Sequence, residues 1–283
     1  MILDSHHHFF SKEQYTEVYE AFGRPDVLRP LLRDFTPEDM KPLLDEVGVD
    51  QTIQVQIGVT QRHTREMLAS AEGYSWIAGV IAWVDLSDPR VGETLDSLCE
   101  HPKFVGIRHP LEHEDDPNWI LRDEVVSGLR ELEKRRIVFD LLVGPRHWDI
   151  LPQLVELLPG LTMVIEHFGR PDAKSTPFVD WEHMMAKMAQ YPKVNAKLSG
   201  IMVLIPDERW DNWHIAELKP YISKTIELFG VDRVMFGSDW PVSTLVGSYK
   251  RNFEAIQGCV TDMREQERSK IFGDNAKRVY QIS

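Results

Sequence analysis

The sequence predicts a (β/α)8 TIM barrel that forms a single domain over residues 1–283. Short apolar segments alternate with longer amphipathic segments along the whole chain. Several of the apolar segments are continuous runs, as in parallel strands that are buried on both faces. A length of 283 residues suits one large barrel, and no linker, repeat or low-complexity stretch divides the chain. The eight predicted strands are 2–4, 52–57, 77–85, 104–108, 137–143, 162–167, 194–198 and 234–237.

The segments between these strands carry helix signals. Thr36 precedes Pro37 and two acidic residues, which is typical of a helix N-terminus, and Gly48 can end that helix. Apolar residues recur at helical spacing in three later segments. A doubly wound open sheet is the alternative fold, but no glycine-rich phosphate loop follows the first strand. The three later segments are 125–132, 151–158 and 222–226.

Composition narrows the possible partners. The chain has 45 acidic and 32 basic residues and a formal charge of −13, so no basic field attracts nucleic acid or an anionic membrane surface. No apolar stretch approaches the ~20 residues of a membrane span, and no signal-peptide pattern begins the chain. We therefore expect a cytoplasmic protein with a small-molecule partner, and a homo-oligomer stays open. Cys99 and Cys259 lack metal-ligand spacing and are expected to be buried thiols.

Ionisable residues follow the first predicted strand, at the end where (β/α)8 barrels carry their active sites. His6 and His8 are two residues apart, so both side chains leave the sheet on the same side. Two converging imidazoles can bind a metal or polarise a carbonyl group. We expect Asp4 to orient a neighbouring histidine, and His7 to have a structural role because it alternates away from the other two.

The ends of later strands add further candidates. Arg108 follows a buried run and is expected to hold the polar end of a substrate with its planar fork of donors. His167 follows the sixth strand, and Asp239 follows the tight exit 236–238 from the eighth. We expect both in the active site. Further candidates for substrate contact are His109, Trp83, Lys197 and Trp240, with ordinary packing as the alternative for the tryptophans.

Several sequence motifs point together to a known family. Asp-x-His-x-His after the first strand, His167 after the sixth and Gly-Ser-Asp-Trp-Pro at 237–241 resemble the amidohydrolase superfamily. The closer resemblance is to its amidohydrolase-related group of sugar lactonases, of the L-fuconolactonase and L-rhamnonolactonase type. It implies a barrel that hydrolyses a lactone ring, with matching active-site residues. The supporting segments are 79–86, 105–109, 197–200 and 273–276; the matching residues are His6, His8, His167, Asp239 and, for the substrate, Arg108.

The resemblance also sets expectations for metal. Metal-rich relatives add a histidine at the end of strand five or a bridging lysine from strand four. Here the fifth strand ends without a histidine, and His147 comes later, so we expect no two-metal site. One divalent ion on His6, His8 and Asp239, with zinc as the expected metal, is one alternative, and a metal-independent site is the other. Segment 166–170 also departs from the Asp-His and Lys-Pro of relatives, which alters substrate contacts.

The expected mechanism is hydrolysis of a cyclic ester. Asp239 takes a proton from water and returns it to the ring oxygen. His6, His8 and His167 polarise the carbonyl group, directly or through the ion. Three rival functions stay open: a metal-dependent non-oxidative decarboxylase, a two-metal phosphotriester or amide hydrolase, and a non-catalytic barrel that binds sugar acids. The loops expected to read the substrate's stereochemistry are 112–119 and 202–213.

Overall fold

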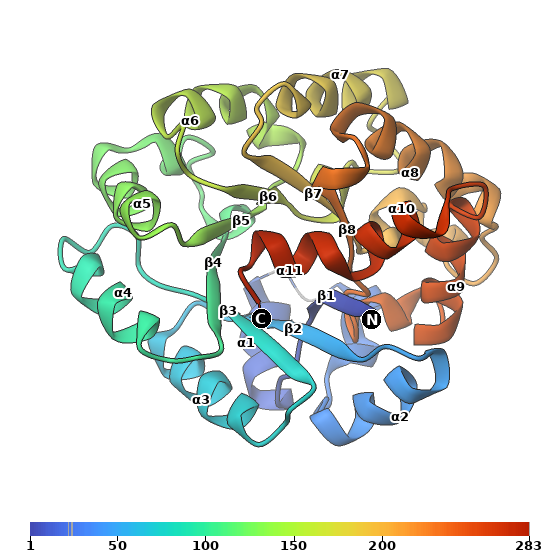
Figure 1. Cartoon of the computed structure of the whole chain (residues 1–283), viewed down its shortest axis with the longest axis horizontal. Coiled ribbons are helices and arrows are strands. Elements are labelled where there is room, and N and C mark those ends of the chain that lie inside the picture. Colours follow the sequence, from blue (N-terminus) through green and yellow to red (C-terminus); the bar gives the residue numbers. More distant parts are fainter. Residues whose placement is uncertain (22, 24, 283) are drawn as a thin grey trace.

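A computed structural model describes residues 1–21, 23 and 25–282. The strands are β1 (Leu3–His7), β2 (Gln51–Val55), β3 (Ile77–Ala82), β4 (Phe104–Pro110), β5 (Val138–Leu142), β6 (Met163–Ile165), β7 (Val194–Leu198) and β8 (Val234–Phe236). Within the described residues these eight strands pair in parallel, in sequence order. Figure 1 shows them at the centre of the molecule with helices around them. The predicted (β/α)8 fold is therefore confirmed.

The first and last strands meet and nearly close the barrel. His7 and Trp240 form a parallel bridge. The His8 backbone N–H donates to the Trp240 carbonyl at 2.7 Å, and the Asp239 N–H donates to the His6 carbonyl at 2.8 Å. This closure holds Asp239 beside His6 and His8, although the two segments come from opposite ends of the chain.

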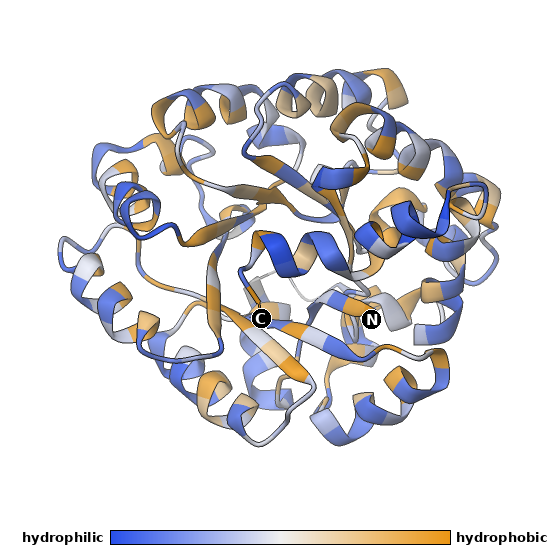
Figure 2. Ribbon diagram, viewed as in Figure 1, coloured by the Kyte–Doolittle hydropathy of each residue, from blue (hydrophilic) through white to orange (hydrophobic). Residues whose placement is uncertain are grey.

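The helices pack their apolar faces against the strands, which are largely apolar in Figure 2. As predicted, Thr36 caps one of them: its hydroxyl accepts from the Asp39 N–H at 3.3 Å, and the Asp39 carboxylate accepts from the Thr36 N–H at 2.9 Å. Gly48 ends that helix with φ 76°. The helices are α1 (Lys12–Ala21), α2 (Pro37–Val47), α3 (Gln61–Glu72), α4 (Val91–Cys99), α5 (Asp123–Arg135), α6 (Leu151–Leu157), α7 (Phe178–Ala189), α8 (Ile215–Phe229), α9 (Tyr249–Cys259), α10 (Glu265–Ser269) and α11 (Asn275–Val279).

The C-terminal helix α11 lies across one end of the barrel (Figure 1). Its Val279 and the adjacent Tyr280 pack with apolar side chains from the strands. These contacts fill the N-terminal end of the barrel, so a site has to form at the carboxyl ends of the strands. The strand residues in this cluster are Leu3, Ile53, Val55, Ile81, Val138, Val164 and Met235.

The structure differs from the predictions at several strand ends and at one cysteine. β1 continues to His7 instead of ending at residue 4, because its pairing with β2 continues past an irregularity. The predicted strand 77–85 stops at Ala82. The Cys99 thiol is exposed, since it lies at the end of α4, and only Cys259 is buried as expected. In the described part of the chain, no helix combines the length and apolar character that crossing a bilayer requires.

Candidate active site

Asp4 fixes the end of β1 against the loop after β8. One carboxylate oxygen accepts hydrogen bonds from the backbone N–H of His6 at 3.1 Å and of Ser238 at 2.8 Å. The other accepts from the Tyr249 hydroxyl on α9 at 3.0 Å. His7 points elsewhere, and its Nε2 lies 2.8 Å from the Thr52 hydroxyl. Asp4 thus orients the histidine segment and His7 is bound structurally, as the sequence predicts.

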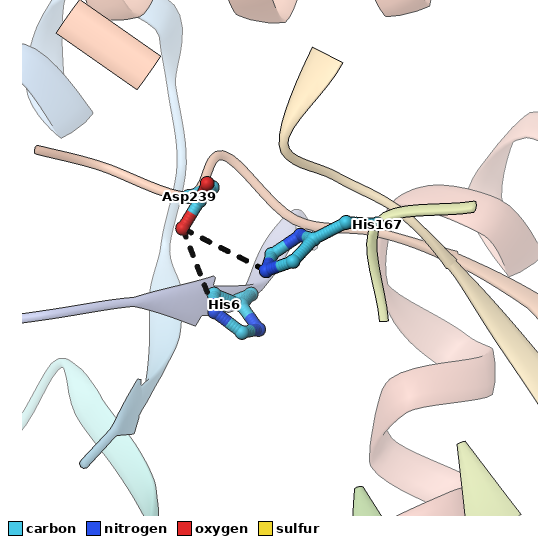
Figure 3. Close-up of side chains that lie close together, drawn as sticks. All are labelled: His6, His167 and Asp239. Atoms are coloured by element: carbon cyan, nitrogen blue, oxygen red, sulfur yellow. Dashed lines mark ion pairs between the residues drawn. The ribbon is translucent and has the colours of Figure 1, made fainter. Parts of the chain in front are cut away.

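Four side chains predicted as catalytic meet at the carboxyl ends of the strands. Asp239 Oδ1 lies 3.3 Å from His8 Nε2, 3.6 Å from His6 Nε2 and 4.0 Å from His167 Nε2. The His6 and His8 Nε2 atoms are 3.2 Å apart. Figure 3 shows His6 and His167 on one side of the Asp239 carboxylate. All four residues are at most 5% exposed, so little water screens them.

The far side of each imidazole decides where its proton lies. His8 Nδ1 is 2.7 Å from a β2 carbonyl oxygen, which can only accept, so Nδ1 carries the proton and Nε2 a lone pair. His6 Nδ1 lies 3.1 Å from a Glu166 oxygen and 3.3 Å from the Lys197 Nζ, so an acceptor and a donor both face this nitrogen. His167 differs, because the Ser199 hydroxyl at 2.9 Å from its Nδ1 can donate or accept. Its Nε2 is therefore free to carry a proton.

Burial and charge set the protonation of the site. Burial lowers the pKa of His6 and of His167 below the usual range for histidine. Burial alone would raise the pKa of Asp239, but the His167, His8 and His6 imidazoles lower it to about 2. At neutral pH the site therefore holds an ionised carboxylate beside neutral His6 and His167.

The donor set fits a divalent ion. A tetrahedral zinc ion with bonds of about 2.0–2.1 Å separates its ligand atoms by roughly 3.3–3.4 Å. The three separations among His6 Nε2, His8 Nε2 and Asp239 Oδ1 are 3.2, 3.3 and 3.6 Å. The His8 Nε2 lone pair and the Asp239 carboxylate repel each other at this distance unless a proton or a cation lies between them. His8 also directs Nδ1 to an acceptor, as metal-bound histidines do.

Two of the site residues have unusual backbone angles. His167 and Asp239 have φ values of 50° and 58°, in the left-handed region that L-residues rarely adopt. Phe168 and Arg170, beside His167, have φ 58° and 48°. These turns direct the two side chains back over the end of the barrel. The Trp240–Pro241 peptide bond that follows Asp239 is cis.

A cavity of about 170 Å³ opens above Asp239. Arg108 lies in its wall, as predicted, with one Nη 3.4 Å from a Glu166 oxygen and the other donating to the Gln56 carbonyl. The buried Arg108 Nε has no acceptor among the described residues, so it is available to a ligand. The cavity is lined by His8, Tyr15, Val18, Leu28, Ile57, Arg108, Pro110, Leu142, His167, Arg170, Met202, Val203, Asp239 and Val242.

Part of the cavity wall was not anticipated from the sequence. Tyr15 and Val18 come from α1, and Leu28 comes from the 3-10 helix Asp26–Leu31, so the segment after β1 covers the site. The spacing of Tyr15, Val18 and Tyr19 was the available signal for this helix. Met202 and other residues of the expected loop 202–213 also line the cavity. Glu112, from the other expected loop, instead pairs with Arg170 at the cavity wall.

Four residues expected to contact substrate lie outside the cavity lining. Trp83 donates from Nε1 to His109 Nδ1 at 3.2 Å, so each uses the other as a partner. Trp240 is 2% exposed and packs edge-on against aromatic rings. Lys197 is fully buried and lies 2.5 Å from Asp140. Their places near strand ends were visible in the sequence, but the neighbouring side chains that separate them from the cavity were not.

Comparisons with known proteins agree with this geometry. The amidohydrolase family profile matches residues 3–282. An L-fucono-1,5-lactonase of Burkholderia ambifaria is 32% identical over 284 residues, 99% of this chain and 95% of that protein. An L-rhamnono-gamma-lactonase of Scheffersomyces stipitis is 27% identical over 199 residues, 62% and 59% of the two chains. A crystal structure of a Burkholderia multivorans amidohydrolase with bound zinc matches at a TM-score of 0.90 and 26% identity over 100% of both chains. The chain therefore belongs to the amidohydrolase family.

Proposed function

We propose that the protein is a lactonase that opens the cyclic ester of a sugar acid or a related carboxylic acid. The observation that carries this proposal is one ionised carboxylate, Asp239, that faces three imidazoles at the floor of a small cavity. The similarity to an L-fucono-1,5-lactonase and an L-rhamnono-gamma-lactonase supports the same reaction class.

The proposed reaction uses each group for one step. Asp239 takes a proton from the attacking water and later gives it to the ring oxygen. A carboxylate with a pKa of about 2 is a weak base toward ordinary water, so that water has to be acidified. A divalent ion held by His6, His8 and Asp239 would supply this acidification. His167, whose Nε2 can carry a proton, then donates to the carbonyl oxygen as charge develops on it.

The cavity limits the substrate to a small ring. An apolar cavity of about 150 Å³ admits a benzene ring, so about 170 Å³ holds one monocyclic lactone. Arg108 Nε offers a hydrogen bond to a polar substituent. The apolar part of the lining suits a methyl group or the carbon face of the ring; it comprises Val18, Leu28, Ile57, Leu142, Met202, Val203 and Val242.

The test is a screen of the purified protein against 1,4- and 1,5-aldonolactones, deoxy analogues and lactone dicarboxylates, read with a pH indicator. We expect at least one monocyclic lactone to be hydrolysed. Asp239→Asn is expected to lower kcat by about 10²–10⁴-fold without changing the circular dichroism spectrum, because the barrel does not depend on this proton transfer. Asp96→Asn, at an exposed carboxylate on α4, is the matched control.

Two further assays, carbon dioxide release and calorimetry, distinguish the rival functions from a lactonase. Release of carbon dioxide from an unsaturated or aromatic acid, with no lactone opened, would replace the proposal with a decarboxylase. Calorimetric binding of an aldonate without turnover would indicate a binding protein. An Asp239→Asn variant that keeps near-normal hydrolysis would contradict the role given to this carboxylate.

A further inference from the structure

A buried charged cluster lies beneath the active site, inside the barrel. Lys197 on β7 and Asp140 on β5 are both 0% exposed, and the Lys197 Nζ lies 2.5 Å from an Asp140 oxygen. The same Nζ is 3.3 Å from His6 Nδ1 and 3.7 Å from a Glu166 oxygen. A salt bridge that served stability alone would need only Asp140, whereas this ammonium group also faces an active-site imidazole and a second carboxylate.

The three partners of Lys197 form a ligand set of their own. One donor atom from each of His6, Asp140 and Glu166 lies within 4.8 Å of the others, and all three residues are buried. Imidazole nitrogen and carboxylate oxygen are donors that divalent ions bind. The Lys197 Nζ lies among these donors, at 2.5–3.7 Å from each. An ion bound to all three would have to take the place of that nitrogen.

The formal charges balance only when Lys197 is present. With Asp140 ionised, Asp140 and Glu166 contribute two negative charges, and Lys197 and Arg108 contribute two positive charges, with Arg108 3.4 Å from Glu166. Burial raises the pKa of Asp140, and the Lys197 ammonium opposes that rise. The second Asp140 oxygen accepts from the Tyr280 hydroxyl at 2.7 Å, which anchors the carboxylate from below.

We propose that the Lys197 ammonium is a tethered cation that fills a second cation site and thereby limits the centre to a single metal ion. The proposal rests on the proposed function only in that the other site, at His6 Nε2, holds the catalytic ion. The Lys197 ammonium therefore balances the Asp140 and Glu166 carboxylates, as a second divalent ion would otherwise do.

The test replaces Lys197 and measures how many zinc ions the variant binds. Lys197→Ala leaves space and two carboxylates facing His6 Nδ1, so it is expected to bind one more equivalent of zinc than the wild type in calorimetry and elemental analysis at pH 8.5. Lys197→Arg keeps the charge and is expected to bind the wild-type number. Ethylammonium, which restores the lost cation, is expected to raise the Tm of Lys197→Ala, whereas uncharged ethanol should not.

The number of zinc ions bound per protein, compared with the wild type, separates this inference from the proposed function. A wild type that binds no zinc would remove the metal from the proposed mechanism, yet Lys197→Ala should still gain one cation. The inference is overturned if Lys197→Ala binds the wild-type number and its Tm responds to neither zinc nor ethylammonium. If Lys197→Ala does not fold, the double variant Lys197→Met with Asp140→Asn replaces it, because both members of the ion pair are then neutral. This double variant should fold and bind as much zinc as the wild type does. A loss of zinc binding would equally reject the inference.

Discussion

The three active-site imidazoles differ in what their Nδ1 atoms contact, and this difference divides their roles. A carbonyl oxygen faces His8, so this ring presents a lone pair at Nε2, whereas a carboxylate and an ammonium group both face His6. A hydroxyl group faces His167, so that ring can present a proton instead. The proposed roles as two metal ligands and one hydrogen-bond donor follow from these partners rather than from position in the sequence.

Arg108 provides a prediction about substrate binding. Arg108→Lys is expected to lower kcat/KM by about 10–100-fold, mainly through KM, because a lysine cannot hold Glu166 and the Gln56 carbonyl while also offering the free Nε–H. Steady-state kinetics on the lactone found in the screen measures this. Arg122→Lys, in a surface pair with Asp116, is the control. A fall in kcat with unchanged KM would show that Arg108 acts only in the transition state.

His147 provides a prediction about pH and stability. Burial, aided by Arg146, lowers the pKa of this histidine from 6.5 to about 4 in the folded protein. The unfolded chain therefore takes up this proton first as the pH falls, and stability is lost between pH 6.5 and 4. The expected loss is about 3 kcal/mol. The free energy of unfolding, measured with urea at several pH values across this range, should depend less on pH for His147→Gln than for the wild type. A variant at the exposed His183 is the control and should behave as the wild type does. Equal pH dependence for His147→Gln and the wild type would contradict the assignment.

Sequence patterns located the site residues but not their partners. His6, His8, His167 and Asp239 were predictable because each lies at or just after the carboxyl end of a strand, and the strands of a parallel barrel end at one face. The contacts of Lys197 were not predictable, because its partners come from three other strand ends and are set by side-chain direction.

Among the elements, the strands were easier to predict than the segment that covers the site. All eight strands occur where the short apolar segments predicted them, with ends that differ by a few residues. Helix α1 and the 3-10 helix after it, Asp26–Leu31, have weaker apolar patterns, because they bury fewer side chains and face a cavity. Such covering segments are specified by the contacts they make on folding, which local periodicity does not record.

Two helical glycines give predictions of opposite sign. A Cβ on Gly128 in α5 would lie 2.1 Å from the Leu86 carbonyl oxygen, so Gly128→Ala is expected to destabilise the protein by about 1–3 kcal/mol. A Cβ on Gly258 in α9 would meet only Ile215 Cδ1, at 3.5 Å, so Gly258→Ala is expected to stabilise by up to about 1 kcal/mol. Chemical denaturation of both variants measures the difference. Stabilisation by Gly128→Ala would refute the close packing of α5 on the loop after β3.

At the scale of the whole molecule, the two ends of the barrel have different tasks. The C-terminal helix α11 and Tyr280 fill one end with apolar contacts and one hydrogen bond to Asp140. The other end carries the cavity and the seam where β1 meets the segment after β8. Because the proposed metal ligands lie on both sides of this seam, an ion there would join the first and last strands.

Metal removal should therefore affect the stability of the entire barrel. Dialysis against a chelator is expected to lower the Tm by about 5–10 °C, because an ion at 100–1,000 times its Kd stabilises the folded state by about 3–4 kcal/mol. Added zinc should restore both the Tm and the activity, and His8→Asn should abolish the response. If chelation changes neither quantity, the metal-independent alternative holds and His6 and His8 act directly on the substrate.

The left-handed backbone at His167 and Asp239 has a consequence for how such a protein evolves. Each residue there costs about 1–2 kcal/mol relative to glycine, so folding and chemistry oppose each other at these two positions. Under selection for thermal stability alone, a population of variants would drift toward glycine at both and lose the site while keeping the barrel. An imidazole and a carboxylate kept at these two positions across diverged relatives would therefore indicate selection for the site, which residues in the apolar core cannot indicate.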